Sequence, residues 1–141
     1  MFGFLKRFGK LGAENPAIKL KPGRGFTFEI VGESHYQKAL SAITGGKTED
    51  GVKVFSDATL RREPNNPYDP NAVRVEISNK TVGYLDRQKA VEYTDTLSRL
   101  GLEGRVTKCE AKIVGGWDRG DDDVGHFGVK LNVSWPPKPK T

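Results

Sequence analysis

A short segment at residues 61–71 concentrates the residue types that could bind a ligand in this chain of 141 residues. It contains three prolines, three asparagines and the pair Tyr68-Asp69, which stands between two of the prolines. Proline fixes φ, and Asn and Asp side chains accept hydrogen bonds from nearby backbone, so a rigid loop between two strands explains part of this composition. A plain turn has no need for an aromatic ring beside a carboxylate. The segment therefore predicts a binding loop whose functional residues are Tyr68 and Asp69.

Arginines on or near this loop add the chemistry of phosphate recognition. A tyrosine ring can stack on a nucleic-acid base, and a guanidinium group can pair with a phosphate. Asn65 and Asn66 either contact a nucleic-acid backbone or brace the turn. For Arg74, an exposed strand face is the alternative to phosphate contact. The candidates for phosphate contact are Arg61, Arg62, Arg74 and Arg87.

A second group of polar residues follows Trp117, where Asp118, Asp121, Asp122, Asp123 and His126 lie in a glycine-rich stretch. Carboxylates in such a cluster could hold a divalent cation, and a small metal-dependent nuclease is the second function class to consider. The spacing does not match an EF-hand, and an exposed acidic hairpin loop is the favoured interpretation. We therefore predict no metal, no cofactor and no catalytic residue.

The charge distribution requires any nucleic-acid site to be local. The chain has 23 basic and 18 acidic residues, but residues 1–27 carry six basic residues and one acid, whereas residues 28–135 carry 15 basic and 17 acidic residues. The central part therefore has a net charge of −2 and no general attraction for phosphate. This balance keeps a third function class open, a protein-interaction adaptor whose basic N-terminal arm and Pro/Lys tail dock partners.

Cysteine usage and hydropathy limit the class of protein further. One cysteine and two histidines exclude an internal disulfide framework and a closed zinc site of the usual kind. Cys109 alternates with core-type residues and is interpreted as a core residue rather than a nucleophile. The N-terminal residues lack a signal-peptide pattern, and the sequence contains no apolar run of membrane-spanning length. We expect a cytoplasmic domain with no integral membrane association.

Apolar periodicity predicts six short strands and two helices. Residues 26–31, 52–62, 73–77, 81–85, 107–113 and 127–133 are predicted strands. Ser34 and Gln37 have capping-box spacing ahead of a helix that Gly45 ends. Asp86 is the predicted cap of a second helix that Gly101 ends. Five or six strands without strict alternation with helices suggest an α+β domain or a small β-barrel with helical insertions.

The same pass along the chain predicts three parts. Residues 1–25 form a basic flexible arm, with a short amphipathic helix around Phe4 to Leu11 as the alternative. Residues 26–135 form the folded domain. Residues 136–141 form a Pro/Lys tail.

Three motifs in the folded part resemble the HIRAN domain family. Residues 60–75 carry Leu, Arg, Glu-Pro-Asn-Asn-Pro-Tyr-Asp and Asn-Ala-Val, residues 82–85 read Val-Gly-Tyr-Leu, and residues 28–33 resemble the opening strand of the family. The similarity runs from about residue 28 to 134 and suggests a stand-alone bacterial or phage member. It implies a mostly β fold, a modified OB-like small barrel with two helices.

The resemblance also implies a function. Relatives occur at the N-terminus of Swi/Snf-type translocases that remodel stalled replication forks, and as bacterial modules. The best-understood member binds the 3′ end of single-stranded DNA. The resemblance therefore implies a non-enzymatic module that binds single-stranded DNA and its 3′-hydroxyl end in DNA repair or replication. A partner nuclease or helicase would lie in another chain, since this sequence has no Gly-x-x-x-x-Gly-Lys-Ser/Thr motor motif.

The roles of single residues come from the same resemblance. It implies that Asp69 accepts a hydrogen bond from the 3′-hydroxyl and that Tyr68 lines the base or sugar. The end-binding member has Arg-Tyr where this chain has Ser34-His35, so His35 or Tyr36 would supply the stacking ring. Two further aromatic residues complete the expected site, Tyr84 where that member has His, and Phe127, whose alternative is burial in the core.

Overall fold

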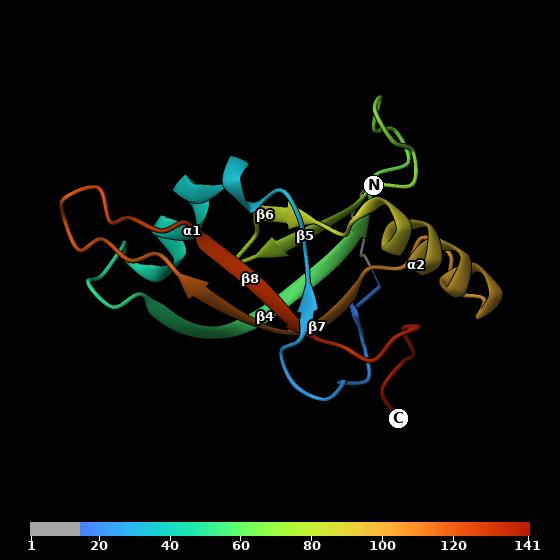
Figure 1. The fold of residues 1–141 in the computed structure, drawn as a ribbon. Helices are drawn as coiled ribbons and strands as arrows, with labels where there is room; N and C mark the ends of the chain where they lie inside the picture. The colour runs from blue at the N-terminus through green and yellow to red at the C-terminus, as the bar shows by residue number, and fades with distance from the viewer. Residues whose placement is uncertain (1–14) are drawn as a thin grey trace, which may run out of the picture.

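The alternating apolar residues form a seven-stranded sheet in the computed structural model, which describes residues 15–141 (Figure 1). The sheet has the order β3-β8-β7-β4-β5-β6, and β2 pairs in parallel with β7 outside this path. The strands are β2 (Ile18–Lys19), β3 (Phe28–Glu29), β4 (Val52–Arg62), β5 (Val73–Ile77), β6 (Lys80–Tyr84), β7 (Thr107–Gly115) and β8 (Phe127–Asn132). The predicted mostly β fold is confirmed, and the strand that sequence periodicity missed is the two-residue β2.

The long strand β4 bends the sheet because it changes partners along its length. Val52 to Leu60 pair with β7, whereas Thr59 to Arg62 pair with β5 on the other side. Ala58 and Leu60 point into the core at the point of overlap and are fully buried. The strand therefore leads from the middle of the sheet to the loop that carries Tyr68.

The bent sheet forms an OB-like half-barrel, and two backbone hydrogen bonds join its two ends. The N–H of Val31, just after β3, donates to the carbonyl oxygen of Tyr84 at 2.8 Å, and the N–H of Tyr84 donates to Val31 O at 2.9 Å. Gly83 permits this approach, because a Cβ at that position would lie 2.7 Å from Val31 O. We refer to these contacts as the seam. It joins the two ends of the sheet order, β3 and β6.

The helices are η1 (Glu33–His35), α1 (Gln37–Thr44) and α2 (Arg87–Arg99). The predicted cap of α2 is confirmed, since the backbone N–H of Lys89 donates to Asp86 Oδ1 at 2.8 Å. The predicted cap of α1 is wrong, because Ser34 lies inside η1 and Tyr36 stands at the N-cap position without a side-chain bond.

The physical reason for the missed cap is a left-handed residue and a distant partner. Gly32 has φ of +83° and turns the chain into η1 before Ser34 is reached. Gln37 Oε1 accepts from the N–H of Phe127 on β8, and Gln37 Nε2 donates to the carbonyl oxygens of Phe127 and Glu33, so the side chain does not accept from the N–H of Ser34 as a capping box requires. Gly45, with φ of +91°, ends α1 as predicted.

The core buries the hydroxyl groups of Tyr93 on α2 and Thr107 on β7. Tyr93 is fully buried, and its hydroxyl lies 2.8 Å from Thr107 Oγ1. Burial raises the pKa of Tyr93 to about 12. Burial likewise raises the pKa of the Cys109 thiol to about 12, which suits a core residue and not a nucleophile.

Part of the segment predicted as a flexible arm lies on the sheet. Leu20 is buried, and residues 19 and 21 exchange backbone hydrogen bonds with residues 138 and 140 of the Pro/Lys tail. Sequence reasoning missed this pairing because β2 has only two residues. The predicted amphipathic helix around Phe4 to Leu11 lies outside the described residues. No helix within residues 15–141 is long and apolar enough to cross a membrane.

Candidate nucleic-acid interface

The connection between β4 and β5, residues 63–72, is a braced loop. Asn66 Oδ1 accepts hydrogen bonds from the backbone N–H of Tyr68 at 2.8 Å and of Asp69 at 3.1 Å. Asn66 Nδ2 donates to Glu63 Oε1 at 2.9 Å. Of its two predicted roles, Asn66 thus has the bracing one in this structure. Asn65 is exposed beside it.

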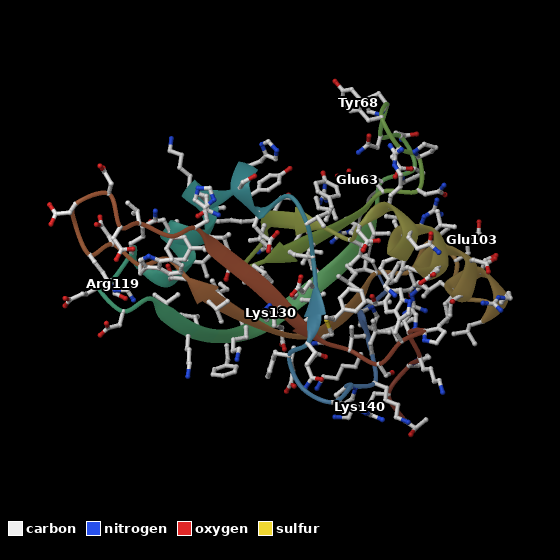
Figure 2. All side chains as sticks on the ribbon, viewed as in Figure 1. Glu63, Tyr68, Glu103, Arg119, Lys130 and Lys140 are labelled. Atoms are coloured by element: carbon white, nitrogen blue, oxygen red, sulfur yellow. The ribbon has the colours of Figure 1, made fainter. Side chains whose placement is uncertain are left out.

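Tyr68 stands at the tip of the loop, where its side chain projects away from the body of the domain (Figure 2). Its exposed fraction is 89%. The preceding proline and the two bonds from Asn66 restrain the backbone that carries the ring. An exposed aromatic side chain on a restrained loop can offer a ring face to a base at a small conformational cost.

The two carboxylate oxygens of Asp69 have different surroundings. Its Oδ1 accepts a hydrogen bond from the backbone N–H of Asn71 at 2.9 Å. Its Oδ2 lies 3.8 Å from Arg87 Nε, which is too long for a hydrogen bond. Arg87 is 79% exposed along its side chain. One carboxylate oxygen therefore supports the loop, and the other can accept a donor from a ligand.

Glu63 connects the loop to two strands, and sequence reasoning missed it. Its Oε2 accepts from Arg74 Nη1 at 2.8 Å and from the Tyr84 hydroxyl at 3.2 Å, while its Oε1 accepts from Asn66. The residue follows β4 directly and reads as part of a proline-rich turn. The signal that could have found it is strand register, which aligns Arg74 with Tyr84 across β5 and β6.

Tyr84 and Tyr36 form a pair of aromatic rings next to the seam. Their ring centroids lie 6.3 Å apart at an angle of 46°. Burial raises the pKa of Tyr84, and the hydrogen bond to the Glu63 carboxylate and its negative charge raise it further. The Tyr84 hydroxyl is therefore a donor held by Glu63. His35 is exposed on η1, the residue before Tyr36.

Most of the arginines predicted for phosphate contact already have protein partners. Arg74 pairs with Glu63 and Glu76 at 2.8 Å each, and Arg61 Nε lies 3.4 Å from Glu76 Oε1. Arg62 Nη2 donates to the carbonyl oxygen of Pro70 at 3.4 Å. Arg87 is the most exposed cation among these pairs. The structure thus gives this interface fewer available cations than the sequence suggested.

Phe127 is not brought to the interface. Its exposed fraction is 2%, and it belongs to the hydrophobic core on β8. Of its two predicted roles, the structure gives it the core one, because a buried ring has no face to offer a base. The side chain of Gln37 on α1 also holds the backbone of Phe127 through two hydrogen bonds.

The acidic stretch after Trp117 forms a hydrogen-bonded turn. Asp123 accepts from Trp117 Nε1 at 3.1 Å and pairs with Arg119 at 3.5 Å. Within residues 15–141, no group of three or more His, Cys, Asp or Glu side chains is arranged to hold a metal ion. The cluster on which the nuclease alternative depended is therefore not assembled in the described residues.

Replacing Glu63 by Gln should lower both the pKa of Tyr84 and the stability of the domain. The variant removes a charge-assisted acceptor shared by Arg74 and Tyr84, and such hydrogen bonds contribute about 1.5–3 kcal/mol to the free energy of unfolding. Because the folded pKa of Tyr84 is raised, its stabilising effect is complete below the ordinary tyrosine pKa and is lost as pH rises above it. Denaturant unfolding and NMR titration of the tyrosine ring carbons measure the two effects. An unchanged Tyr84 titration in the variant would show that Glu63 does not act on it.

Comparison with known proteins assigns the fold to a family. The model of the HIRAN domain family matches residues 25–124. The crystal structure of the HIRAN domain of human HLTF is similar, with 17% sequence identity, 59% of this chain and 74% of that chain covered, and a TM-score of 0.28. No curated protein matches the chain.

Proposed function

Because this chain belongs to the HIRAN domain family, we propose that it is a DNA-binding module that takes the 3′-hydroxyl end of single-stranded DNA at the loop of residues 63–72. Tyr68 stacks on a base and Oδ2 of Asp69 accepts the hydrogen bond of the terminal hydroxyl. The module acts in the cytoplasm and delivers a nuclease or helicase in another chain to damaged or replicating DNA.

The observation that carries this proposal is a partly buried carboxylate, with 21% of its side chain exposed and no hydrogen bond to Oδ2 within residues 15–141, that directly follows an exposed tyrosine in the chain. An ionised carboxylate only accepts hydrogen bonds, and it repels phosphate. Oδ2 of Asp69 therefore adds nothing to general backbone attraction, but it matches a free hydroxyl. Tyr36 and Tyr84 supply further ring surface at the seam.

A competition between matched single strands tests the proposal. A strand that ends in a 3′-phosphate loses the donor and brings a like charge, so it should bind about tenfold or more weakly than the 3′-hydroxyl strand. Asp69→Asn should abolish this preference while the domain stays stable, because the amide oxygen can still accept from Asn71. Equal affinity of the wild type for both ends would overturn end recognition. Duplex and RNA competitors define the substrate class in the same assay.

The salt dependence of binding should be shallow. With Arg61, Arg62 and Arg74 engaged by protein acceptors, about one or two phosphates are neutralised, which gives a slope of log K against log salt of roughly −0.7 to −1.4. Arg87→Ala should reduce the slope by about 0.7. Fluorescence anisotropy at several salt concentrations measures it. A slope steeper than about −2.8 would mean that the paired arginines turn to the DNA or that other cations contribute.

A further inference from the structure

A second aromatic surface lies on the solvent-facing side of β4 and β7. Phe55 is 62% exposed, and its ring packs edge-on against Phe26 at a centroid distance of 5.3 Å. Arg62 lies seven positions after Phe55 on β4, which is roughly 23 Å along the strand at about 3.3 Å per residue. The surface is therefore separate from the loop of residues 63–72.

Two carboxylates lie next to these rings without a cation partner. Asp57 on β4 stands directly opposite Glu110 on β7. Glu110 Oε1 accepts a hydrogen bond from Asn132 Nδ2 at 3.3 Å, but within residues 15–141 no Lys, Arg or His nitrogen lies within 4.0 Å of either carboxylate. Like charges directly opposite in a sheet are destabilising. Lys19, Lys108 and Lys140 line a neighbouring cavity together with both carboxylates and offset part of this repulsion, and a cation bound in contact with the carboxylates would offset more of it.

The rings and the carboxylates line one open groove of about 350 Å³. Lys112 lies opposite Phe55 but does not line the groove, and its Nζ is 5.7 Å from the Phe26 centroid and 6.0 Å from the Phe55 centroid. A cation of the chain itself therefore already lies within cation–π distance of both rings, and an incoming guanidinium group would have to displace this ammonium group or stack beside it. The groove is lined by Phe26, Phe55, Ser56, Asp57, Glu110 and Ala111.

We propose that this groove binds an arginine side chain presented by a basic peptide segment of a partner protein. A guanidinium group is planar, so it stacks on a phenyl ring while its N–H groups donate to carboxylate oxygens. Asp57 and Glu110 provide the complementary charge. The same carboxylates repel phosphate, so they disfavour a second DNA track on this surface. The domain then has two independent surfaces, one for DNA at the loop and one for a protein partner on β4 and β7.

The test is an NMR titration of the full chain with a capped Gly-Arg-Gly-Arg-Gly peptide and with the same peptide carrying neutral citrulline in place of arginine. The arginine peptide should shift the amide signals of Phe55, Asp57 and Ala111, and the citrulline peptide should bind at least about fivefold more weakly. Phe55→Ala should weaken binding of the arginine peptide about two- to fivefold through loss of the cation–π contact. Asp57→Asn, which has nearly the same shape, should weaken it by up to about fivefold.

Tyr68→Ala is the matched control, since it also removes an exposed ring but should leave peptide affinity unchanged. Conversely, Phe55→Ala should leave affinity for single-stranded DNA unchanged, so this inference and the proposed DNA site fail independently. Equal binding of the two peptides, or no shifts at millimolar arginine peptide, would overturn the proposal. So would a pair of variants in which Phe55→Ala weakens and Asp57→Asn strengthens DNA binding, because this surface would then be a DNA track.

Discussion

Gly83→Ala should lower the free energy of unfolding by about 2–4 kcal/mol. The added Cβ would lie 2.7 Å from Val31 O and 2.8 Å from Ile30 Cδ1, so the seam must open or the core must shift. Overpacking costs about 1–3 kcal/mol, and each of the two seam hydrogen bonds contributes about 1 kcal/mol. Denaturant unfolding monitored by circular dichroism measures the loss. Affinity for DNA should fall too, because the seam holds Tyr36 beside Tyr84.

Gly128→Ala on β8 is the matched control for this prediction. A Cβ there would meet Glu33 Oε2 at 3.7 Å and Val114 Cγ2 at 4.0 Å, which are ordinary contacts. Its effect on stability should therefore stay within about 0.5 kcal/mol. If both alanine variants cost the same, the close approach at the seam is not what makes glycine necessary at position 83.

The parts of the fold that the sequence predicts are those fixed by local chemistry. The alternation in β4, β5, β7 and β8 follows from burying one face of each strand, and Asp86 caps α2 because its side chain reaches a backbone N–H three residues away. The strand count left an α+β domain and a small β-barrel open, and the resemblance to a known family favoured the barrel. Local signals fail at α1, where the left-handed Gly32 and a contact with β8 decide the start of the helix.

The sequence predicted the exposed residues of the candidate site but not the residue that supports the loop. Tyr68 and Asp69 can be recognised because their residue types exceed what a turn needs. Glu63 cannot, since the pairing of β4 with β5 brings Arg74 to it and the pairing of β5 with β6 brings Tyr84. The pairing of β4 with β5 also places Arg61 and Arg74 beside Glu76, although the sequence alone presents both arginines as free cations. The number of charged residues near a predicted site therefore does not tell how many are free to contact phosphate until the strand register is known.

Tyr68→Ala should weaken binding of single-stranded DNA about five- to 150-fold and leave stability unchanged. Stacking contributes roughly 1–3 kcal/mol per base, which converts to that range. With 89% of its surface exposed, the ring packs too little against the domain to affect folding, so the free energy of unfolding should change by less than about 0.5 kcal/mol. Anisotropy titration with a labelled strand and thermal unfolding of the same sample measure both quantities.

Tyr68→Phe separates stacking from hydrogen bonding at this position. Phenylalanine keeps the ring face but loses the hydroxyl, so near-native affinity is expected if the ring acts by stacking. An affinity loss as large as that of the alanine variant would assign the effect to the hydroxyl instead. A well-folded Tyr68→Ala variant with an unchanged dissociation constant would remove Tyr68 from the site. The binding surface would then have to lie at Tyr36 and Tyr84, where the seam and Glu63 hold ring and hydroxyl in place.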